Sequence, residues 1–484
     1  MRRPENVSFL PAQVDAALAS RPLTATISPL YLFLSDLVLF FGNAFYLPGI
    51  VFPLAPWPSG HLDELYPSLA NLSAISVHLF LVCLQLGFLL SLPLGLFFVG
   101  AVWLLYCAAV LFAVFLVCLP LNGGRNGQKV LSDRRILHGC DPKDRESWVF
   151  INGVAVGKHW LQSNLDRLSL TFLRPITGVH NITAGIVFDV LECLIQRDFS
   201  YHPRDVRQTY AFLKNALLDP HKDKVVLLAH SQGGIIASMA LDWLYAELPL
   251  SALRKLEVYT FGCAANHFNN PFRAARPGDA ATDAERDDPL RARVNPDSPL
   301  AGSARAILGA QPGAAASTAP FDDARAVAHV EHYANECDFV ARWGVLHYAA
   351  RAERFAGRVF TRRGASGHQL NQHYLDAMFP LDDGRAAVRE YNEFVDAECE
   401  VDEALVMRRE EPEVAEMDRI LGSDGDGEGK ETVEVAMGDG KGRVGPLGKM
   451  YRKATRARAR AAQGARVRDL SRLWAYRNGM SPED

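Results

Sequence analysis

Residues 227–234 read Leu-Leu-Ala-His-Ser-Gln-Gly-Gly and join an apolar segment, 224–230, to a run of small and apolar residues. The first segment is typical of a buried strand and the second of a helix. A serine in so tight a strand-to-helix turn takes a strained backbone conformation, so the residues two before and two after it must be small. Ala229 and Gly233 meet this requirement. The stretch predicts that Ser231 is a nucleophile and that the backbone N–H of Gln232 is an oxyanion donor.

On both sides of this turn, strand and helix signals alternate through residues 145–400. The strands are predicted at 148–153, 176–180, 224–230, 256–261, 327–335 and 357–361, and the helices at 159–172, 184–195, 206–218, 233–248 and from about 370. This order predicts an α/β domain with a mostly parallel sheet and flanking helices. Residues 274–326 interrupt it with Ala, Pro, Asp and Arg, which predicts a disordered insertion.

Two motifs carry a resemblance to the α/β-hydrolase family. Ala229-His-Ser-Gln-Gly-Gly resembles the nucleophile turn of its lipase and esterase branch, and Val258-Tyr-Thr-Phe-Gly-Cys resembles a strand of class 3 lipases. The resemblance covers roughly residues 147–395. It departs from the family pattern at Ala229, where glycine is usual, and it omits the first strands of the fold. It implies an α/β-hydrolase-type sheet and catalytic residues in the order serine, acid, histidine.

That order locates the other two candidates. Asp338, in Glu-Cys-Asp-Phe-Val, follows the second strand after Ser231 and resembles the acid motif of class 3 lipases, with Glu336 as the alternative. The loop after the last strand offers His368 and His373, which are about 140° apart around a helix, so only one can face the nucleophile. We prefer His368 because it directly follows the Gly-rich loop, and His373 remains the alternative.

The second oxyanion donor is expected from the loop after the strand at 148–153. Gly153 allows the backbone there to turn its amides inward, which favours the N–H of Val154. A neutral His368 would take the proton of Ser231, and Asp338 would fix the histidine tautomer.

Composition limits the possible classes of function. The 484 residues suffice for a full enzyme core, and 51 Lys and Arg against 55 Asp and Glu give a net charge of −4, which provides no basic field for nucleic acid. The eight cysteines form no CxxC pair, so neither a zinc site nor a disulfide framework is predicted. We expect no cofactor and no metal.

The segment 27–121 predicts a helical transmembrane region that follows a polar leader, 1–26. Residues 27–53 carry one charge, Asp36, and match one membrane crossing. Residues 74–121 contain no charged residue and are too long for one crossing, so Pro93 is the expected break between two helices.

Charge predicts the orientation of this region. Lys and Arg flank it on both outer sides, whereas the loop 53–73 has none, so the positive-inside rule puts both ends in the cytosol and the loop in the lumen. Three membrane crossings would instead put the catalytic domain on the other side of the membrane from the N-terminus. We follow the charge, and so expect the Asn181-Ile-Thr sequon to stay unglycosylated. The tail, 401–484, is predicted to be disordered, and its basic segment, 449–477, either lies on anionic lipid or is solvated.

The sequence thus predicts an integral membrane serine hydrolase that cleaves an ester, most plausibly of a lipid, through an acyl-enzyme. Its expected partners are the lipid substrate and the bilayer, because an active site tethered beside a bilayer meets lipid at high effective concentration. The alternatives are an acyltransferase or thioesterase with the same triad, and an inactive hydrolase-fold membrane scaffold. The sequence predicts no oligomeric state.

Overall fold

The computed structural model describes most of the chain outside the insertion and the tail. The described residues are 6–12, 28–98, 100–124, 129–137, 143–271, 325–350, 355–401, 438–439, 443–444 and 462–482. The predicted disorder of the insertion and of the first part of the basic segment therefore falls outside the described residues. The base of the insertion is described: Ala326 N–H donates to Pro271 O at 2.9 Å, so the two sides of the insertion meet.

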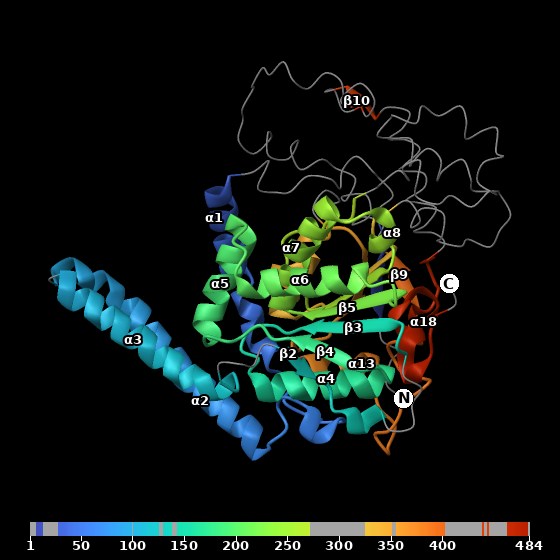
Figure 1. Ribbon diagram of the computed structural model, residues 1–484, viewed down its shortest axis with the longest axis horizontal. Coiled ribbons are helices and arrows are strands. Elements are labelled where there is room, and N and C mark those ends of the chain that lie inside the picture. Colours follow the sequence, from blue (N-terminus) through green and yellow to red (C-terminus); the bar gives the residue numbers. More distant parts are fainter. Residues whose placement is uncertain are drawn as a thin grey trace.

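A mostly parallel sheet forms the centre of the molecule (Figure 1). Its strands, in spatial order, are β2 (Lys129–Leu131), β4 (Ile176–Val179), β3 (Glu146–Ile151), β5 (Lys224–His230), β6 (Leu256–Phe261), β7 (His329–Asn335), β8 (Arg358–Arg362), β1 (Val7–Leu10) and β9 (Cys399–Val401). From β4 to β8 all neighbours are parallel, whereas β2 is antiparallel to β4 and β1 to β8. The predicted α/β class with a mostly parallel sheet is confirmed.

Helices flank the sheet on both sides. They are α4 (Lys158–Phe172), α5 (Ile186–Phe199), α6 (Arg204–Leu218), α7 (Gln232–Glu247), and the short α8 (Leu250–Leu253), α11 (Phe339–Trp343), α12 (Val345–Tyr348) and α13 (Asp376–Met378). In Figure 1, α6 and α7 lie on one side of the sheet and α4 on the other. The central strand β5 is therefore buried on both faces, which explains its uninterrupted Val and Leu run.

The N-terminal leader contains a strand, so the prediction of a merely polar leader is wrong. β1 pairs antiparallel with β8 and parallel with β9, and Val7 and Phe9 are buried in the core. The strand is only four residues long, and its partners lie near the other end of the chain. Local sequence carries no signal of such a distant pairing.

The end of the tail is also ordered, which corrects the prediction of a disordered tail from 401 onward. Leu473, Trp474 and Tyr476, in α18–η9 (Val467–Leu470 and Leu473–Gly479), are buried, and Tyr476 stacks edge-on against Trp148 at 5.1 Å. The Tyr476 hydroxyl donates to Glu257 Oε2 at 2.7 Å. A lipid-bound helix would direct these apolar side chains to the membrane. In the structure they cover the sheet.

The first apolar segment is part of the α/β domain. It forms α1 (Pro29–Gly42) and the 3-10 helix η2 (Ala44–Ile50), which meet at a 69° bend. Asp36 is buried and pairs with Arg197 of α5, whose guanidinium lies 3.8 Å from the Trp343 ring centroid. α1 therefore packs on the α/β domain through the one charged residue of its segment.

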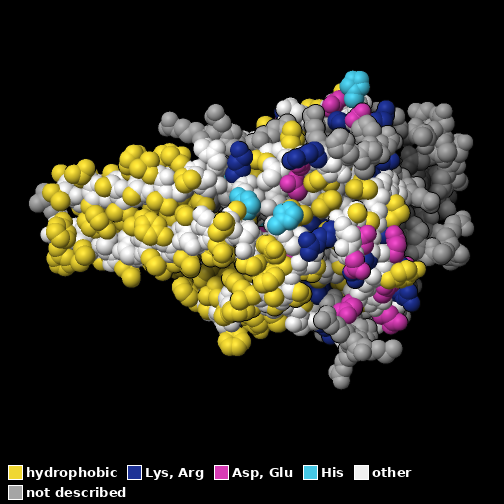
Figure 2. Space-filling model, turned by 90° about the horizontal axis from the view of Figure 1, so that it is seen from below, with side chains coloured by type: hydrophobic (Ala, Val, Ile, Leu, Met, Phe, Trp, Pro, Cys, Tyr) yellow, Lys and Arg dark blue, Asp and Glu magenta, His cyan; other side chains and the backbone are white. Residues whose placement is uncertain are grey.

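The second apolar segment forms a hairpin that projects from the domain (Figure 1). Its arms are α2 (Leu69–Ser91) and α3 (Gly100–Leu121), and the 3-10 helix η4 (Leu92–Phe97) leads into the turn, so the break expected at Pro93 is confirmed. By length and composition, two helical stretches, Leu69–Phe97 and Gly100–Leu121, are able to cross a membrane, or three if the bent pair α1–η2 counts as one span. Figure 2 shows that charged side chains lie on the body of the molecule and that the hairpin surface is apolar. We call Leu69–Leu121 the apolar hairpin.

The loop before the hairpin packs on the α/β domain, whereas the positive-inside rule predicts that the two lie on opposite sides of the membrane. Glu64 is buried, and its Oε1 accepts from Asn164 Nδ2 of α4 at 2.8 Å and from the Asn371 N–H of the π-helix η8 (Leu370–Leu375) at 3.0 Å. The positive-inside rule considers only Lys and Arg, so it takes no account of the buried Glu64 carboxylate that holds this loop on the domain.

A buried polar cluster completes this contact around η3 (Gly60–Leu62). Arg167 Nε donates to Ser59 Oγ at 2.7 Å, and Arg167 Nη2 lies 3.3 Å from Asp376 Oδ1. Ser59 N–H donates to Asp63 Oδ2 at 3.1 Å. Among the described residues no group of three or more His, Cys, Asp or Glu is arranged to hold a metal ion.

Asp63→Asn is expected to raise the melting temperature at alkaline pH. Burial, reinforced by the charges of Asp376 and Glu64, raises the pKa of Asp63 to about 9, whereas the carboxyl ionises near pH 4 in the unfolded chain. The folded state therefore binds an extra proton between these values, and its stability falls as the pH rises through that window. Asparagine keeps the acceptor for Ser59 and has no proton to lose. The increase should be about 2–4 °C at pH 8 and should shrink toward pH 5, as measured by thermal unfolding.

The matched control is Asp383→Asn, because the Asp383 side chain is 99 % exposed. Its melting temperature should follow that of the unmodified protein at every pH. A lower melting temperature of Asp63→Asn at pH 8 would show that Asp63 is ionised in the folded state.

Candidate active site

Ser231 stands at the turn between β5 and α7 in a strained backbone conformation, with φ 58° and ψ −123°. Its N–H donates to Phe261 O at 3.0 Å, and its carbonyl accepts from Ala264 N–H at 3.1 Å, so the turn is fixed to the end of β6. A Cβ at Gly153 would collide with the Ser231 side chain, and one at Gly233 would collide with Ile151 O. The turn thus requires small neighbours, as its sequence indicated.

Asp338 and His368 lie together at the carboxyl edge of the sheet. Asp338 ends the loop after β7 and caps α11, where its Oδ1 accepts from Val340 N–H at 2.8 Å. Its Oδ2 lies 2.7 Å from His368 Nδ1, and both side chains are buried. The carboxylate accepts, so Nδ1 carries the proton and Nε2 of a neutral ring is left as a proton acceptor.

Gly262 lies between this pair and Ser231. It directly follows Phe261, whose carbonyl binds Ser231, and its φ of 52° is in the left-handed region. A Cβ at this position would lie 2.9 Å from Asp338 Oδ2 and 3.0 Å from His368 Nδ1. The glycine therefore lets the backbone that holds the serine approach the acid and the histidine closely.

The alternative histidine is engaged elsewhere. His373 Nδ1 accepts from Gln369 N–H at 3.0 Å, so Nε2 carries the proton and donates to Pro53 O at 2.8 Å. Burial lowers the pKa of His373, which favours the neutral ring. Both nitrogens are in use, so the ring holds the segment before the hairpin and has no free lone pair for a serine proton. The alternative acid, Glu336, accepts from Gly364 N–H at 2.7 Å and does not contact His368.

The two predicted oxyanion donors flank Ser231. Gln232 is the first residue of α7, and its side chain is held by Asn181 Nδ2, which donates to Gln232 Oε1 at 2.7 Å. Val154 follows Gly153, which borders the Ser231 side chain. Asn152 fixes this loop, because its Nδ2 donates to Gly153 O at 3.1 Å and to Asn181 O at 2.9 Å.

Two residues of the site escaped the sequence analysis. The Tyr374 hydroxyl donates to Asp338 Oδ2 at 2.6 Å, and burial beside that carboxylate raises the pKa of Tyr374 well above its usual value. His230 Nε2–H donates to His368 O at 2.8 Å, and burial lowers the pKa of His230 far below its usual value, so the ring is neutral. His230 adjoins the serine and could have been suspected, whereas Tyr374 has no sequence signal.

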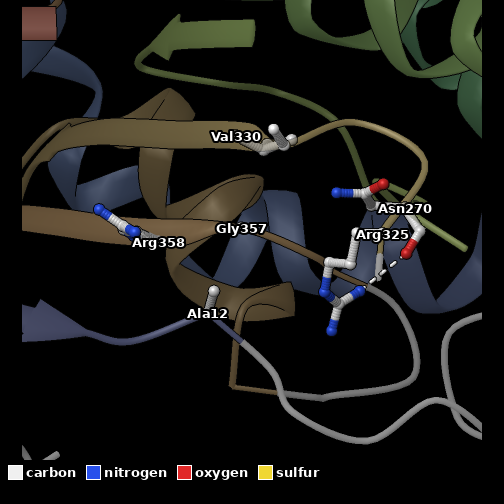
Figure 3. A pocket seen from close by; sticks show the side chains of 7 residues that line it. Ala12, Asn270, Arg325, Val330, Gly357 and Arg358 are labelled. Atoms are coloured by element: carbon white, nitrogen blue, oxygen red, sulfur yellow. Dashed lines mark hydrogen bonds between the residues drawn. The ribbon is translucent and has the colours of Figure 1, made fainter. Parts of the chain in front are cut away.

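A small surface cavity lies at the other edge of the sheet (Figure 3). Its walls include Val330 and Gly357, at the amino ends of β7 and β8, and Arg325, whose Nη1 donates to Asn270 O at 2.7 Å. Arg325 and Asn270 lie at the base of the insertion, whereas Ser231 lies at the carboxyl end of β5. The cavity is therefore separate from the candidate active site.

Comparison of the chain with protein-family models, with curated proteins and with solved structures finds no match.

Proposed function

We propose that this chain is a membrane-anchored serine hydrolase of the α/β-hydrolase type, in the lipase and esterase branch, that cleaves a lipid ester. The observation that carries the proposal is the 2.7 Å contact between Asp338 and His368 at the sheet edge where Ser231 begins α7. A serine in a strained turn, a histidine and a buried carboxylate are the three groups that acyl-enzyme chemistry requires.

The mechanism follows from the proton positions. His368 Nε2 takes the proton of Ser231 as the serine oxygen attacks the ester carbonyl, while Asp338 stabilises the imidazolium through Nδ1. The N–H groups of Gln232 and Val154 stabilise the oxyanion of the tetrahedral intermediate. His368 then protonates the leaving alcohol, and water, activated by the same ring, hydrolyses the acyl-enzyme.

Apolar surface beside the site favours a lipid substrate. Ile182 is exposed and follows Asn181, which binds Gln232. On the other side, His368 N–H donates to Ile50 O at 3.3 Å, and the exposed Phe52 lies two residues further along. Exposed apolar side chains near residues that bind Gln232 and His368 support an acyl-chain substrate, and the apolar hairpin supports a membrane location.

We assign the catalytic domain to the cytosol. Lys and Arg precede residue 27 and follow residue 121, and the positive-inside rule favours the cytosolic side for both segments, whereas the loop 53–73, which packs on the same domain, contains neither. The sequon at Asn181 should accordingly carry no glycan when the chain is expressed in a secretory-competent cell. A glycan at Asn181, detected by a glycosidase-sensitive mass shift, would place the site in the lumen.

The test uses the purified full chain in phospholipid vesicles. It should be labelled by a fluorophosphonate probe and should release fatty acid from an ester lipid, measured by mass spectrometry. An added acceptor alcohol that captures the acyl group would favour a transferase, and faster turnover of a thioester would favour a thioesterase. A folded protein with neither labelling nor product would be a scaffold.

Tyr374→Phe is expected to shift the pH profile of turnover. The hydroxyl neutralises part of the Asp338 charge, so its loss strengthens the attraction between Asp338 and protonated His368. The acid limb of kcat/KM should move to higher pH by about 0.5 to 1 unit. Tyr333→Phe is the control, because it removes a buried tyrosine hydroxyl that donates to another carboxylate, Glu331, at 2.7 Å. An unmoved profile in Tyr374→Phe would show that Asp338 does not act through His368.

A further inference from the structure

The turn of the apolar hairpin, residues 92–99, carries no charged or hydrogen-bonding side chain. From Leu86 to Val117 the sequence has no charged residue, and at the turn Leu96 and Phe97 are 86 % and 83 % exposed. A loop on the far side of a membrane lies in water, where exposed Leu and Phe side chains lack the favourable transfer free energy that hydrocarbon provides. This turn is instead suited to hydrocarbon.

The polar hydroxyls near the turn bind within the hairpin. Ser91 Oγ donates to Phe88 O at 2.6 Å and lies 2.8 Å from the Tyr106 hydroxyl of the opposite arm. An unbonded hydroxyl is costly in hydrocarbon, whereas a bonded pair is tolerated. The pair also joins the two arms just below the turn.

The α/β domain limits how far the hairpin projects. Gln85 Oε1 accepts from Val187 N–H at 3.2 Å, and the Phe88 ring lies 6.2 Å from the Phe188 ring of α5, so α2 is fixed to the domain up to Phe88. Three further helical residues and the six of η4 add at most about 17 Å. The hydrocarbon core of a bilayer is about 30 Å thick, so this length spans about half of it.

We propose that the apolar hairpin is a one-sided anchor, which enters the hydrocarbon of a single leaflet from the side of the α/β domain and keeps its turn inside. The occupant of its exposed face is the acyl-chain region of that leaflet. Both arms begin and end at the domain, since α2 follows the loop held by Glu64 and α3 ends beside Asn122, whose Nδ2 donates to Thr183 O at 2.8 Å. The proposal does not depend on enzymatic activity.

The first test locates the turn. Leu96→Cys and, as control, Tyr391→Cys on the domain surface are each placed in a chain whose native cysteines are replaced by serine, and the full chain is reconstituted into sealed phosphatidylcholine vesicles. A membrane-impermeant maleimide is added outside in one sample and enclosed in another. The thiol of the Leu96→Cys variant should react from neither side until detergent is added, whereas the control reacts from outside. Reaction from inside would mean a crossing, and reaction from outside would mean no insertion; either result overturns the proposal.

The second test needs no cysteine replacement. Leu96→Lys combined with Phe97→Lys puts two charges into hydrocarbon if the turn is buried, so partition of the full chain into the same vesicles should fall at least about a hundredfold. Tyr391→Lys is the control for added charge and should bind as the unmodified chain does. Unchanged partition of the double variant would overturn the proposal, because a turn in water tolerates lysine.

Discussion

Ser231→Ala is expected to abolish fluorophosphonate labelling and to lower turnover of an ester lipid at least about a thousandfold, because no nucleophile remains at the turn. Alanine keeps the Cβ that fits beside Gly153, so the melting temperature should stay within about 1 °C. Initial rates of fatty-acid release and probe labelling check both expectations.

Ser238→Ala provides the matched control. Ser238 is also a buried serine of α7, and its Oγ donates to Ile235 O at 2.9 Å, away from the Asp338 carboxylate. This variant should keep both labelling and turnover. If Ser231→Ala retained turnover, Ser231 would not be the nucleophile and the proposed mechanism would be wrong.

His368→Ala is expected to reduce kcat at least about a thousandfold, because binding and oxyanion stabilisation alone would remain. The contact with Asp338 supports this role, and loss of the ring leaves that carboxylate without its imidazole partner. Steady-state rates measured with the variant in vesicles give the comparison.

His373→Ala tests whether His373, in the same segment, has a structural or a catalytic role. It removes the bonds to Gln369 N–H and Pro53 O, so the melting temperature should fall while kcat changes less than about tenfold. The opposite pattern, with His373→Ala inactive and His368→Ala active, would show that His373 is the general base.

The parallel part of the fold could be predicted because its signals are local. The strands β3 to β6 are short runs rich in apolar residues, the helices α4 to α6 are amphipathic, and β5 and β6 have the predicted bounds. β1 and η9 were missed because each is short and buried only through partners hundreds of residues away. Apolar composition likewise could not show that α1 packs on the domain, since its partner Arg197 lies far along the chain.

For the candidate site, the sequence indicated residue types and their order but not their bonds. Ser231, Asp338 and His368 were each chosen by their place after a strand, and parallel strands bring such places to one edge. The choice between His368 and His373 required the hydrogen bonds of both rings. Tyr374 could not be predicted, because a hydroxyl that reaches Asp338 from a π-helix has no recognisable spacing.

The pairing of β1 with β8 and β9 has a consequence for biosynthesis. The ribosome releases Val7–Leu10 well before the partners of this strand, Arg358–Arg362 and Cys399–Val401, which emerge on the order of 350 residues later. At the usual speed of translation this delay lasts tens of seconds or more. Once Leu121 has left the exit tunnel the apolar hairpin is complete, while the strands β2 to β9 have yet to emerge. The nascent chain therefore needs a lipid surface or a chaperone for the hairpin well before its α/β domain closes.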